Sequence, residues 1–321
     1  MPKFAAKMKV YNSIAEMPQI TNAVVTQGTF DGVHLAHQQI LKRLKQIALQ
    51  TNGETVLITY EPHPRMVLFP DDHGLKLISS IDEKIALLEK QGIDHLLILP
   101  FTIEFSKWSS LQFIKEIIVD AIHTKYLVIG YNHRFGKNRE GSFEHLKTYS
   151  SAYGFEVQEI PVQEIDNLSI SSTKIREALF KSNCILAKHY LGYFYSFHAT
   201  VVKGKQLGRQ IGFPTANLIL TDSDKIVPAN AVYAVFVEIA DQLYKGMMNI
   251  GNNPSIPDKE HSIEVHIFDF NEDLYNQRIR VHFVDKLREE MRFHSLEDLK
   301  TQLNKDKLHA IAVLEQDPYE I

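Results

Sequence analysis

The first half of this sequence is constrained most by a regular alternation of strand-like and helix-like segments. Short runs rich in Val, Ile and Leu are separated by segments whose apolar residues recur every three to four positions, as in a helix. The strand-like runs lie at residues 22–30, 54–60, 95–101, 126–132 and 155–162. Strands separated by helices usually pair in parallel through crossover connections, so the pattern predicts an α/β domain with a parallel sheet.

Several helix ends can also be predicted. The first helix begins near His34 and ends at Asn52 and Gly53. Ser80 and Glu83 have the spacing of a capping box, which predicts another helix that Gly92 closes.

The pattern changes after about Cys184. Five β-rich segments follow, at residues 194–204, 232–240, 243–251, 262–270 and 278–287. They are separated by turn residues rather than helices, which predicts an antiparallel barrel. Ser295 and Asp298 then cap a terminal helix. We expect two domains, residues 1–184 and 185–321.

Composition excludes several classes of protein. Of the 321 residues, 44% are apolar and the net charge is −4, so the chain has neither the composition of a disordered protein nor the basic excess typical of nucleic-acid binders. No apolar run reaches the length of a membrane span, and the first residues lead us to expect no secretory signal. Cys184 is the only cysteine, which excludes an intrachain disulfide and a zinc site of several thiolates. We therefore expect a cytoplasmic protein that binds neither nucleic acid nor membrane.

Residues 28–37, GTFDGVHLAH, join the first predicted strand to the first helix. A helix N-terminus at the carboxyl end of a parallel strand attracts phosphate, and Gly28 and Gly32 let the backbone approach a ligand closely. His34 and His37 can donate hydrogen bonds to phosphoryl oxygens. Two other interpretations stay open here, namely a plain turn with solvent-facing histidines and a metal site that needs further ligands.

Residues 170–176, ISSTKIR, open another predicted helix. A simple N-cap followed by a surface arginine would explain the segment. However, Thr173 and Arg176 lie three residues apart and share one helix face. Two hydroxyls, a guanidinium and a helix N-terminus together are suited to a polyphosphate.

The two segments together resemble the paired HxGH and ISSTxxR signatures of the nucleotidyltransferase superfamily. With residues 60–64 (YEPHP) and 130–136 (GYNHRFG), they resemble the adenylyltransferase half of bacterial bifunctional FAD synthetases. The resemblance implies a Rossmann-like domain that transfers AMP from ATP to FMN and releases pyrophosphate. Ala36 stands where the signature has glycine, and His133 where phenylalanine is common.

The same resemblance implies roles for individual residues. His34 and His37 would stabilise the transition state at the α-phosphate, and Arg176 would hold the β- and γ-phosphates with Ser172 and Thr173. Further ATP or phosphate contacts would come from Gly28, Phe30, Asp31, Gly32 and Ser171. The flavin would contact Tyr60, Pro62, His63, Pro64, Asn132 and Arg134.

Residues 204–217, GKQLGRQIGFPTAN, have the composition of a loop. They closely resemble the GFPTAN signature of riboflavin kinases, and further segments of that family follow in order at residues 249–251, 263–266, 273–275 and 287–290. The resemblance implies a six-stranded barrel that transfers the γ-phosphate of ATP to the ribityl 5′-hydroxyl of riboflavin.

Glu264 is the candidate general base, because a primary alcohol is a poor nucleophile at neutral pH. Its pattern alone would also suit an exposed strand carboxylate. Thr215 and Asn217 offer hard oxygen atoms for Mg²⁺ and ATP phosphates. Arg288 would contact the flavin or order the loop over it. The resemblance also assigns ATP contacts to Gly204, Gly208 and Gly212, and the chain departs from the family glycines at Ala231 and Asn276.

We therefore expect a bifunctional enzyme that uses ATP and Mg²⁺ to convert riboflavin to FMN and FMN to FAD. One rival is a riboflavin kinase that has lost adenylyl transfer, which Ala36 would explain. Others are a flavin-binding protein without turnover and a metal-dependent hydrolase that uses His34 and His37. The sequence predicts no oligomeric state.

Overall fold

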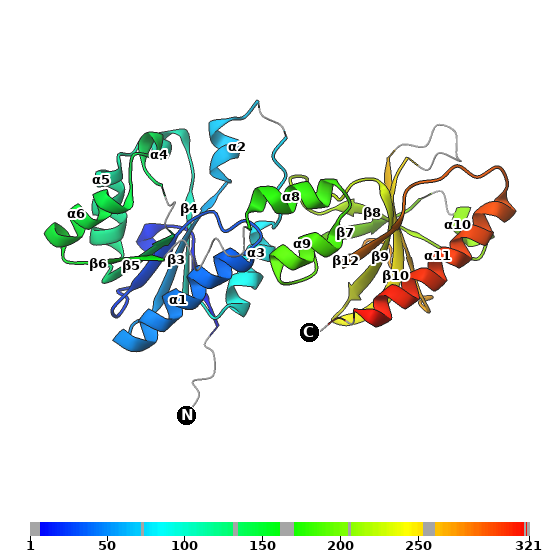
Figure 1. Ribbon diagram of the computed structural model, residues 1–321, viewed down its shortest axis with the longest axis horizontal. Helices are drawn as coiled ribbons and strands as arrows, with labels where there is room; N and C mark the ends of the chain where they lie inside the picture. The colour runs from blue at the N-terminus through cyan, green and yellow to red at the C-terminus, as the bar shows by residue number, and fades with distance from the viewer. Residues whose placement is uncertain are drawn as a thin grey trace. The chain divides into compact units, whose positions relative to one another are not determined.

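The structure, a computed structural model, describes residues 7–71, 74–130, 134–160, 170–204, 207–252, 261–317 and 319. By packing, the chain divides into two compact units, Met1–Ser171 and Ser172–Ile321. Figure 1 shows the first unit from blue to green and the second from green to red. Each unit is described by itself.

A six-stranded sheet forms the centre of the first unit. Its neighbouring strands pair in parallel, in the order β1-β4-β3-β2-β5-β6. The strands are β1 (Lys9–Tyr11), β2 (Val24–Gln27), β3 (Thr55–Glu61), β4 (His95–Pro100), β5 (Tyr126–Gly130) and β6 (Glu156–Ile160). The five predicted strands are confirmed. The short edge strand β1 was missed, because three partly exposed residues carry no strand pattern.

The direction in which the sheet is built reverses at β2. The chain adds β3 and β4 on one side of β2 and returns to add β5 and β6 on the other. In open α/β sheets ligands bind at such a switch point, beyond the carboxyl ends of the strands. The loop after β2, which carries the first predicted site, lies at this position.

Both faces of the sheet are covered, as a parallel sheet requires. Val24, Leu57 and Leu96 pack with helices α1 (Leu35–Thr51) and α3 (Ile81–Lys90). Val25, Ile58 and Leu97 face the opposite core. That core contains α5 (Ser110–Phe113), the π-helix η2 (Ile114–Ala121) and α6 (Phe143–Tyr153). Shorter elements are η1 (Ile14–Glu16), α2 (Pro64–Leu68), α4 (Ile103–Ser106) and η3 (Lys137–Arg139).

The predicted helix ends are confirmed. His34 is the N-cap of α1, and Asn52 ends that helix in the left-handed conformation. Ser80 and Glu83 form both hydrogen bonds of the capping box at α3.

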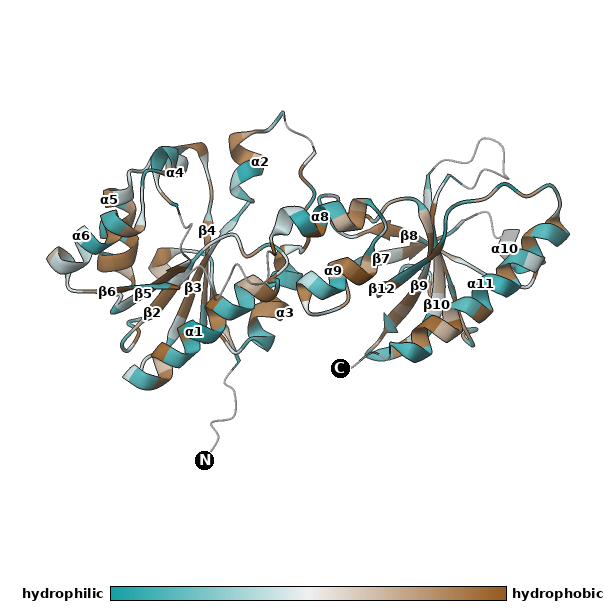
Figure 2. Ribbon diagram, viewed as in Figure 1, coloured by the Kyte–Doolittle hydropathy of each residue, from teal (hydrophilic) through white to brown (hydrophobic). Residues whose placement is uncertain are grey.

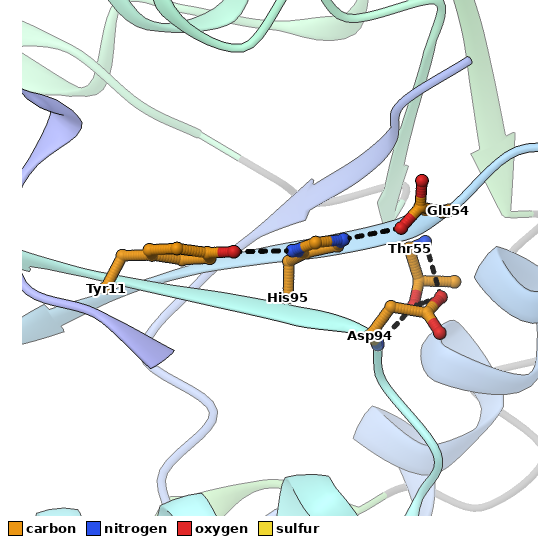
Figure 3. Close-up of polar contacts among 5 residues, drawn as sticks. All are labelled: Tyr11, Glu54, Thr55, Asp94 and His95. Carbon is orange, nitrogen blue, oxygen red and sulfur yellow. Dashed lines mark hydrogen bonds and ion pairs between the residues drawn. The ribbon is translucent and has the colours of Figure 1, made fainter. Parts of the chain in front are cut away.

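A polar network joins β1 with the starts of β3 and β4, at the end of the sheet away from the loop after β2 (Figure 3). The Tyr11 hydroxyl lies 3.1 Å from Nδ1 of His95, whose Nε2 lies 2.9 Å from Oε2 of Glu54. Nearby, the Asp94 carboxylate accepts hydrogen bonds from the backbone and the hydroxyl of Thr55. The Tyr11–His95 contact attaches the short strand β1 to β4, and the other bonds join the starts of β3 and β4.

A closed six-stranded barrel forms the centre of the second unit, in the order β10-β11-β8-β7-β12-β9. All its pairings are antiparallel, as predicted. The strands are β7 (Ser196–Val202), β8 (Ala216–Leu220), β9 (Ala231–Ile239), β10 (Gln242–Gly251), β11 (Ser262–Ile267) and β12 (Arg278–Arg288). The helices are α8 (Ser172–Phe180), α9 (Cys184–Leu191), α10 (Leu207–Gln210) and α11 (Leu296–Gln316).

The predicted loop at residues 204–217 needs correction, because it contains α10 and the first two residues of β8. The pattern missed β8 because only one residue of this strand, Leu218, is buried. Ser295 caps α11 by accepting a hydrogen bond from Asp298, as predicted. Ala310 and Leu314 of α11 pack with barrel residues such as Phe236. Figure 2 shows the mixed hydropathy of this helix and the hydrophobic strands beside it.

Helices α8 and α9 belong by packing to the barrel unit. The backbone N–H of Ala229 donates to the carbonyl of Leu179 at 3.2 Å, and the Tyr233 hydroxyl, which donates to the carbonyl of Ala229, lies 3.0 Å from Oγ of Ser182. The sequence predicts two domains, residues 1–184 and 185–321, with one activity in each. This boundary stays a prediction. Along the described ranges, no helix is both long and apolar enough to cross a bilayer.

Candidate active sites

The first candidate site is the loop after β2, which we call the loop site and define as residues 28–37 with Ser79 and Lys84. Its backbone is tightly held. Gly28 donates from its N–H to the carbonyl of Ile58 at 3.0 Å, which continues the β2–β3 pairing. Gly32 has a φ of +81°, and a Cβ there would lie 2.8 Å from Cγ2 of Ile78, so both its conformation and its surroundings require glycine.

Asp31 anchors the loop site from inside. Its side chain is buried and accepts hydrogen bonds from the N–H groups of Ile78 and Ser79, both at 3.0 Å. In return, the N–H of Gly32 donates to Oγ of Ser79 at 3.0 Å. These bonds attach the loop to the segment just before α3. Asp31 thus has a clear structural task, and its predicted phosphate contact stays a prediction.

The two histidines of the loop site lie against each other at the start of α1. Their rings stack with centroids 3.6 Å apart, and Nδ1 of His34 accepts a hydrogen bond from the N–H of His37 at 3.4 Å. Burial, together with His34 and Lys84, lowers the pKa of His37 well below its usual range. Nδ1 of His37 is buried and has no hydrogen-bond partner among the described residues. A neutral imidazole therefore lies at a helix N-terminus with one ring nitrogen unused.

Lys84 is a site residue that sequence reasoning missed. It lies in the first turns of α3, is only 4% exposed, and has a lowered pKa because burial outweighs the nearby charges of Asp31 and Glu61. A signal was present in the sequence. The apolar face of α3 runs through Ile81, Ile85 and Leu88, and Lys84 occupies a position on that face.

The first of the predicted flavin residues, Tyr60, lies at the end of the neighbouring strand β3. The Tyr60 ring packs edge-on against Phe101 with centroids 5.7 Å apart, and its hydroxyl donates to Oε1 of Gln27 at 2.5 Å. Gln27 is 4% exposed, and its Nε2 has no partner among the described residues. Burial raises the pKa of Tyr60, which keeps the phenol protonated and able to donate.

The remaining predicted flavin residues lie on two other segments of the first unit. The Glu61–Pro62 peptide bond is cis, and Pro64 begins α2, whose N-cap is His63. Arg134 is exposed and follows β5, the other neighbour of β2. Residues 60–64 thus lie at and beyond the end of β3, and Arg134 follows β5; both strands pair with β2, at the same edge as the loop site. Asn132 and His133 lie outside the described residues.

The second predicted signature straddles the boundary between the two units. Ser171 ends the first unit, whereas Ser172, Thr173 and Arg176 lie in α8 of the second. Ile175 of the same helix is fully buried. Thr173 is exposed and Arg176 is partly exposed, so the helix presents the predicted phosphate-binding residues at its surface.

The second candidate site is the strand site, which we define as Thr215, Asn217 and Glu264. In the register of the barrel, Glu264 of β11 pairs with Asn217 of β8. Oγ1 of Thr215 donates to Oε2 of Glu264 at 3.1 Å, and Oγ of Ser262 donates to Oε1 at 3.1 Å. The barrel thus brings together predicted residues that are far apart in the sequence. Three oxygen-bearing side chains lie together there. Such a group suits a divalent cation, either alone or bound to a phosphate.

Two glycines allow the close packing of the strand site. A Cβ on Gly204 would lie 2.0 Å from Nδ2 of Asn217, and one on Gly208 would lie 2.2 Å from the carbonyl oxygen of Phe213. Gly212 has a φ of +84°, which favours glycine for conformational reasons. Their predicted ATP contacts stay predictions.

Arg288 forms a buried ion pair. Its guanidinium donates to both carboxylate oxygens of Asp306 in α11 at 2.7–3.0 Å, and to the carbonyl of Glu289 at 2.9 Å. The charge also lies over the Phe293 ring, 5.7 Å from its centroid. Arg288 thus joins the end of β12 to α11, and its predicted contact with the flavin or with the loop over it stays a prediction.

The described residues contain no group of three or more His, Cys, Asp or Glu side chains placed to hold a metal ion. The signature at residues 28–37 contains three residues of these types, His34, His37 and Asp31, and the Asp31 carboxylate accepts hydrogen bonds from the N–H groups of Ile78 and Ser79.

Known proteins resemble this chain over most of its length. The profile of the FAD synthetase family matches residues 16–174, and that of the riboflavin kinase family matches residues 191–314. Curated proteins called bifunctional riboflavin kinase/FMN adenylyltransferase are similar in sequence. That of Haemophilus influenzae is 36% identical over 89% of this chain and 92% of its own length, and that of Pseudomonas fluorescens is 37% identical over 92% and 94%.

A solved structure from Streptococcus pneumoniae, described as a macrolide-efflux protein, has a similar fold. Its TM-score is 0.83 at 30% identity, and the match covers 95% of this chain and 99% of that one. The Escherichia coli K12 bifunctional riboflavin kinase/FMN adenylyltransferase is 35% identical over 93% of this chain and 95% of its own length. On these relatives and the two matching profiles, the chain belongs to the bifunctional riboflavin kinase/FMN adenylyltransferase family.

Proposed function

We propose that this chain phosphorylates riboflavin to FMN at the strand site and adenylylates FMN to FAD at the loop site, in the cytoplasm, with ATP as the donor in both reactions. The observation that carries the kinase half is the 3.1 Å hydrogen bond between Thr215 and Glu264. It joins the signature segment of the kinase family to the carboxylate that the chemistry needs.

In the kinase reaction, Glu264 accepts the proton of the ribityl 5′-hydroxyl. The hydroxyl oxygen forms a bond to the γ-phosphorus of ATP, the bond from that phosphorus to the β–γ bridging oxygen breaks, and ADP leaves. Hydrogen bonds from Thr215 and Ser262 hold the carboxylate in one orientation, which is the preorganisation that a general base requires.

Thr215 and Asn217 are the proposed ligands of Mg²⁺. Their oxygens are hard donors, which fits this ion. When bound, Mg²⁺ neutralises charge on the ATP phosphates. The protein's own contribution is to hold Asn217 beside Glu264 through the pairing of β8 with β11, and Thr215 through its hydrogen bond to the Glu264 carboxylate.

In the adenylyl transfer, a phosphate oxygen of FMN attacks the α-phosphorus of ATP, and the bond to the bridging oxygen of pyrophosphate breaks. FMN already carries the nucleophile, so the protein needs no covalent intermediate. His34 and His37 donate hydrogen bonds to the α-phosphate at the N-terminus of α1, and Lys84 adds a buried positive charge to the loop site. The lowered pKa of His37 supports a neutral donor there.

By the same proposal, Tyr60, residues 62–64 and Arg134 contact the flavin of FMN. Ser172, Thr173 and Arg176 hold the β- and γ-phosphates of ATP. The family resemblance supports these roles, and the profile match to residue 174 includes the start of α8. We also propose residues 1–184 and 185–321 as the functional division.

The test is incubation of the full chain with riboflavin, ATP and Mg²⁺, followed by chromatographic separation of flavins. FMN should form first and FAD later. Accumulation of FMN alone would favour the kinase-only rival, and bound flavin without conversion would favour the binding-protein rival.

One observation gives the kinase-only rival specific support. Ala36 is buried at the start of α1, where the family has glycine. Overpacking by one methyl costs about 1–3 kcal/mol, or roughly tenfold to a hundredfold in rate or binding. Ala36→Gly should lower the ATP concentration needed for FAD formation and leave FMN formation unchanged. The rival is correct if the natural chain makes no FAD at any ATP concentration and the variant does.

A further inference from the structure

His266 is a buried side chain that the proposed mechanism does not use. It lies on β11, two residues after Glu264, and is 8% exposed. Its Nδ1 lies 2.7 Å from the carbonyl oxygen of Pro214. Because a carbonyl can only accept, Nδ1 must carry the proton and donate it.

The acceptor is the residue directly before Thr215. Pairing of β8 with β11 comprises Asn217 with Glu264 and Ala216 with Val265, and goes no further toward Pro214. Proline has no N–H, so it could not donate to an extended pairing. The imidazole of His266 therefore provides an attachment for the signature segment beyond the last paired residue of β8.

The ring of His266 is itself held in place. It packs edge-on against Phe213 with centroids 5.3 Å apart and against Phe268 at 5.5 Å. Burial and Lys307 lower its pKa, and these effects outweigh those of Pro214 and Asp269. His266 is thus neutral near pH 7. Protonation would occur at Nε2 and would leave the donor at Nδ1 unchanged.

We propose that His266 is a positioning residue for riboflavin phosphorylation, which holds the carbonyl of Pro214 and thereby fixes Thr215 against Glu264. The proposal rests on the function assigned above to the strand site. Two side chains on one face of β11 then hold two consecutive residues of the signature, Pro214 through His266 and Thr215 through Glu264. Loss of the first bond frees the peptide between Pro214 and Thr215, and displacement of a catalytic group by about 1 Å can cost about 10²-fold in rate.

Two isosteric variants of the full chain test the proposal. In His266→Asn, the amide nitrogen can occupy the place of Nδ1 and donate to Pro214, whereas the amide of His266→Gln extends toward the place of Nε2. We expect His266→Asn to keep the kinase kcat within about threefold of the natural chain. His266→Gln and His266→Leu should lower kcat and raise the KM for ATP, for a combined loss of about 10–100-fold in kcat/KM.

FMN adenylylation by the same preparation is the internal control and should be unchanged in all three variants. Circular dichroism and thermal unfolding report whether each variant folds. Equal activity of the Asn and Gln variants, at either a high or a low level, would overturn the proposal, because a purely structural histidine would not distinguish the two amides in kcat.

Glu264→Gln separates this inference from the proposed function. If Glu264→Gln keeps full kinase activity, the strand site is assigned wrongly. If it is inactive and His266→Leu is fully active, only the positioning role of His266 is wrong.

Discussion

The two candidate sites differ in how the fold brings their residues together. In the loop site, the carboxylate of Asp31 and the hydroxyl of Ser79 hold the loop that carries the two histidines. In the strand site, the pairing of β8 with β11 places Asn217 beside Glu264. Side-chain contacts between separate segments thus hold the loop site together. The strand site depends instead on the register of the barrel strands. Substitutions should consequently have broad effects in the first and local effects in the second.

The largest effect should come from Glu264→Gln in the strand site. Loss of a positioned general base costs about 10²–10⁴-fold in rate, so riboflavin phosphorylation should fall by that factor. FMN adenylylation and thermal stability should stay near those of the natural chain. Rates of both reactions and a melting curve check this, and an equal loss of both activities would contradict a local role.

Asp31→Ala tests the loop site at its anchor. The change leaves the buried N–H groups of Ile78 and Ser79 without an acceptor, and a hydrogen bond to a charged group contributes about 1.5–3 kcal/mol. We expect the first unit to lose about 3 kcal/mol of stability and FAD formation to fall with it, while FMN formation persists. Denaturant unfolding measures this loss of stability. Asp120→Ala, which removes an exposed carboxylate, is the control. Unchanged stability would show that the loop does not depend on this anchor.

Arg176→Ala tests which activity α8 serves. The helix packs with the barrel unit, yet the family resemblance assigns it to adenylyl transfer. Loss of a charge-assisted phosphate contact should lower kcat/KM for ATP in FAD formation by about 10–100-fold, and lysine should restore it only in part, because it lacks the bidentate fork. FMN formation should not change. A variant that loses stability and keeps its turnover would make Arg176 structural.

Two fragments sharpen the comparison of the units. Residues 172–321 and residues 185–321 should both make FMN and no FAD. The longer fragment keeps the bonds from Leu179 to Ala229 and from Ser182 to Tyr233, and it keeps Leu179 buried. It should be more stable by about 2–4 kcal/mol, since a buried leucine and two hydrogen bonds are retained. Equal denaturation midpoints would show that α8 adds nothing to the barrel unit.

The smallest effect concerns pH. The pKa of His37 in the first unit, and of His266 and His282 in the second, is lowered mainly by burial. The unfolded chain takes up protons at these histidines near pH 6.5, whereas the folded chain does so only at lower pH. Their contribution to stability is therefore complete above about pH 6.5 and decreases on acidification, by at most about 1.4 kcal/mol per histidine and pH unit.

Urea unfolding at pH 7.5, 6.5 and 5.5 measures this dependence. Residues 172–321 contain two of these three histidines, and His282→Gln should make the dependence of that fragment shallower. Stability that increases from pH 6.5 to 5.5 would contradict the sign.

Much of the fold could be predicted because its signals are local. The helix of α3 follows from Ser80 and Glu83, two residues that cap it by contacts three positions apart. The predicted strands are long apolar runs, and their alternation with helices indicates parallel pairing. β1 and β8 were missed because short strands with few buried residues have no such pattern.

In the candidate sites, too, some features had a local signal in the sequence and others had none. Motif resemblance identified Glu264, Thr215 and the two histidines without any knowledge of distance. Lys84 had a detectable signal as a charge on an apolar helix face, whereas the contacts of Gln27 with Tyr60 and of His266 with Pro214 had none.

By itself, the sequence determined most of the elements, the two architectures and the family, because propensity, capping and motif spacing act over a few residues. Only the tertiary structure decided that Asp31 anchors a loop, that Arg288 pairs with Asp306 and that His266 holds Pro214. These contacts join residues 18 to 52 positions apart. Such pairs depend on strand register and on which helix covers which face. Those are properties of packing that no short stretch of sequence contains.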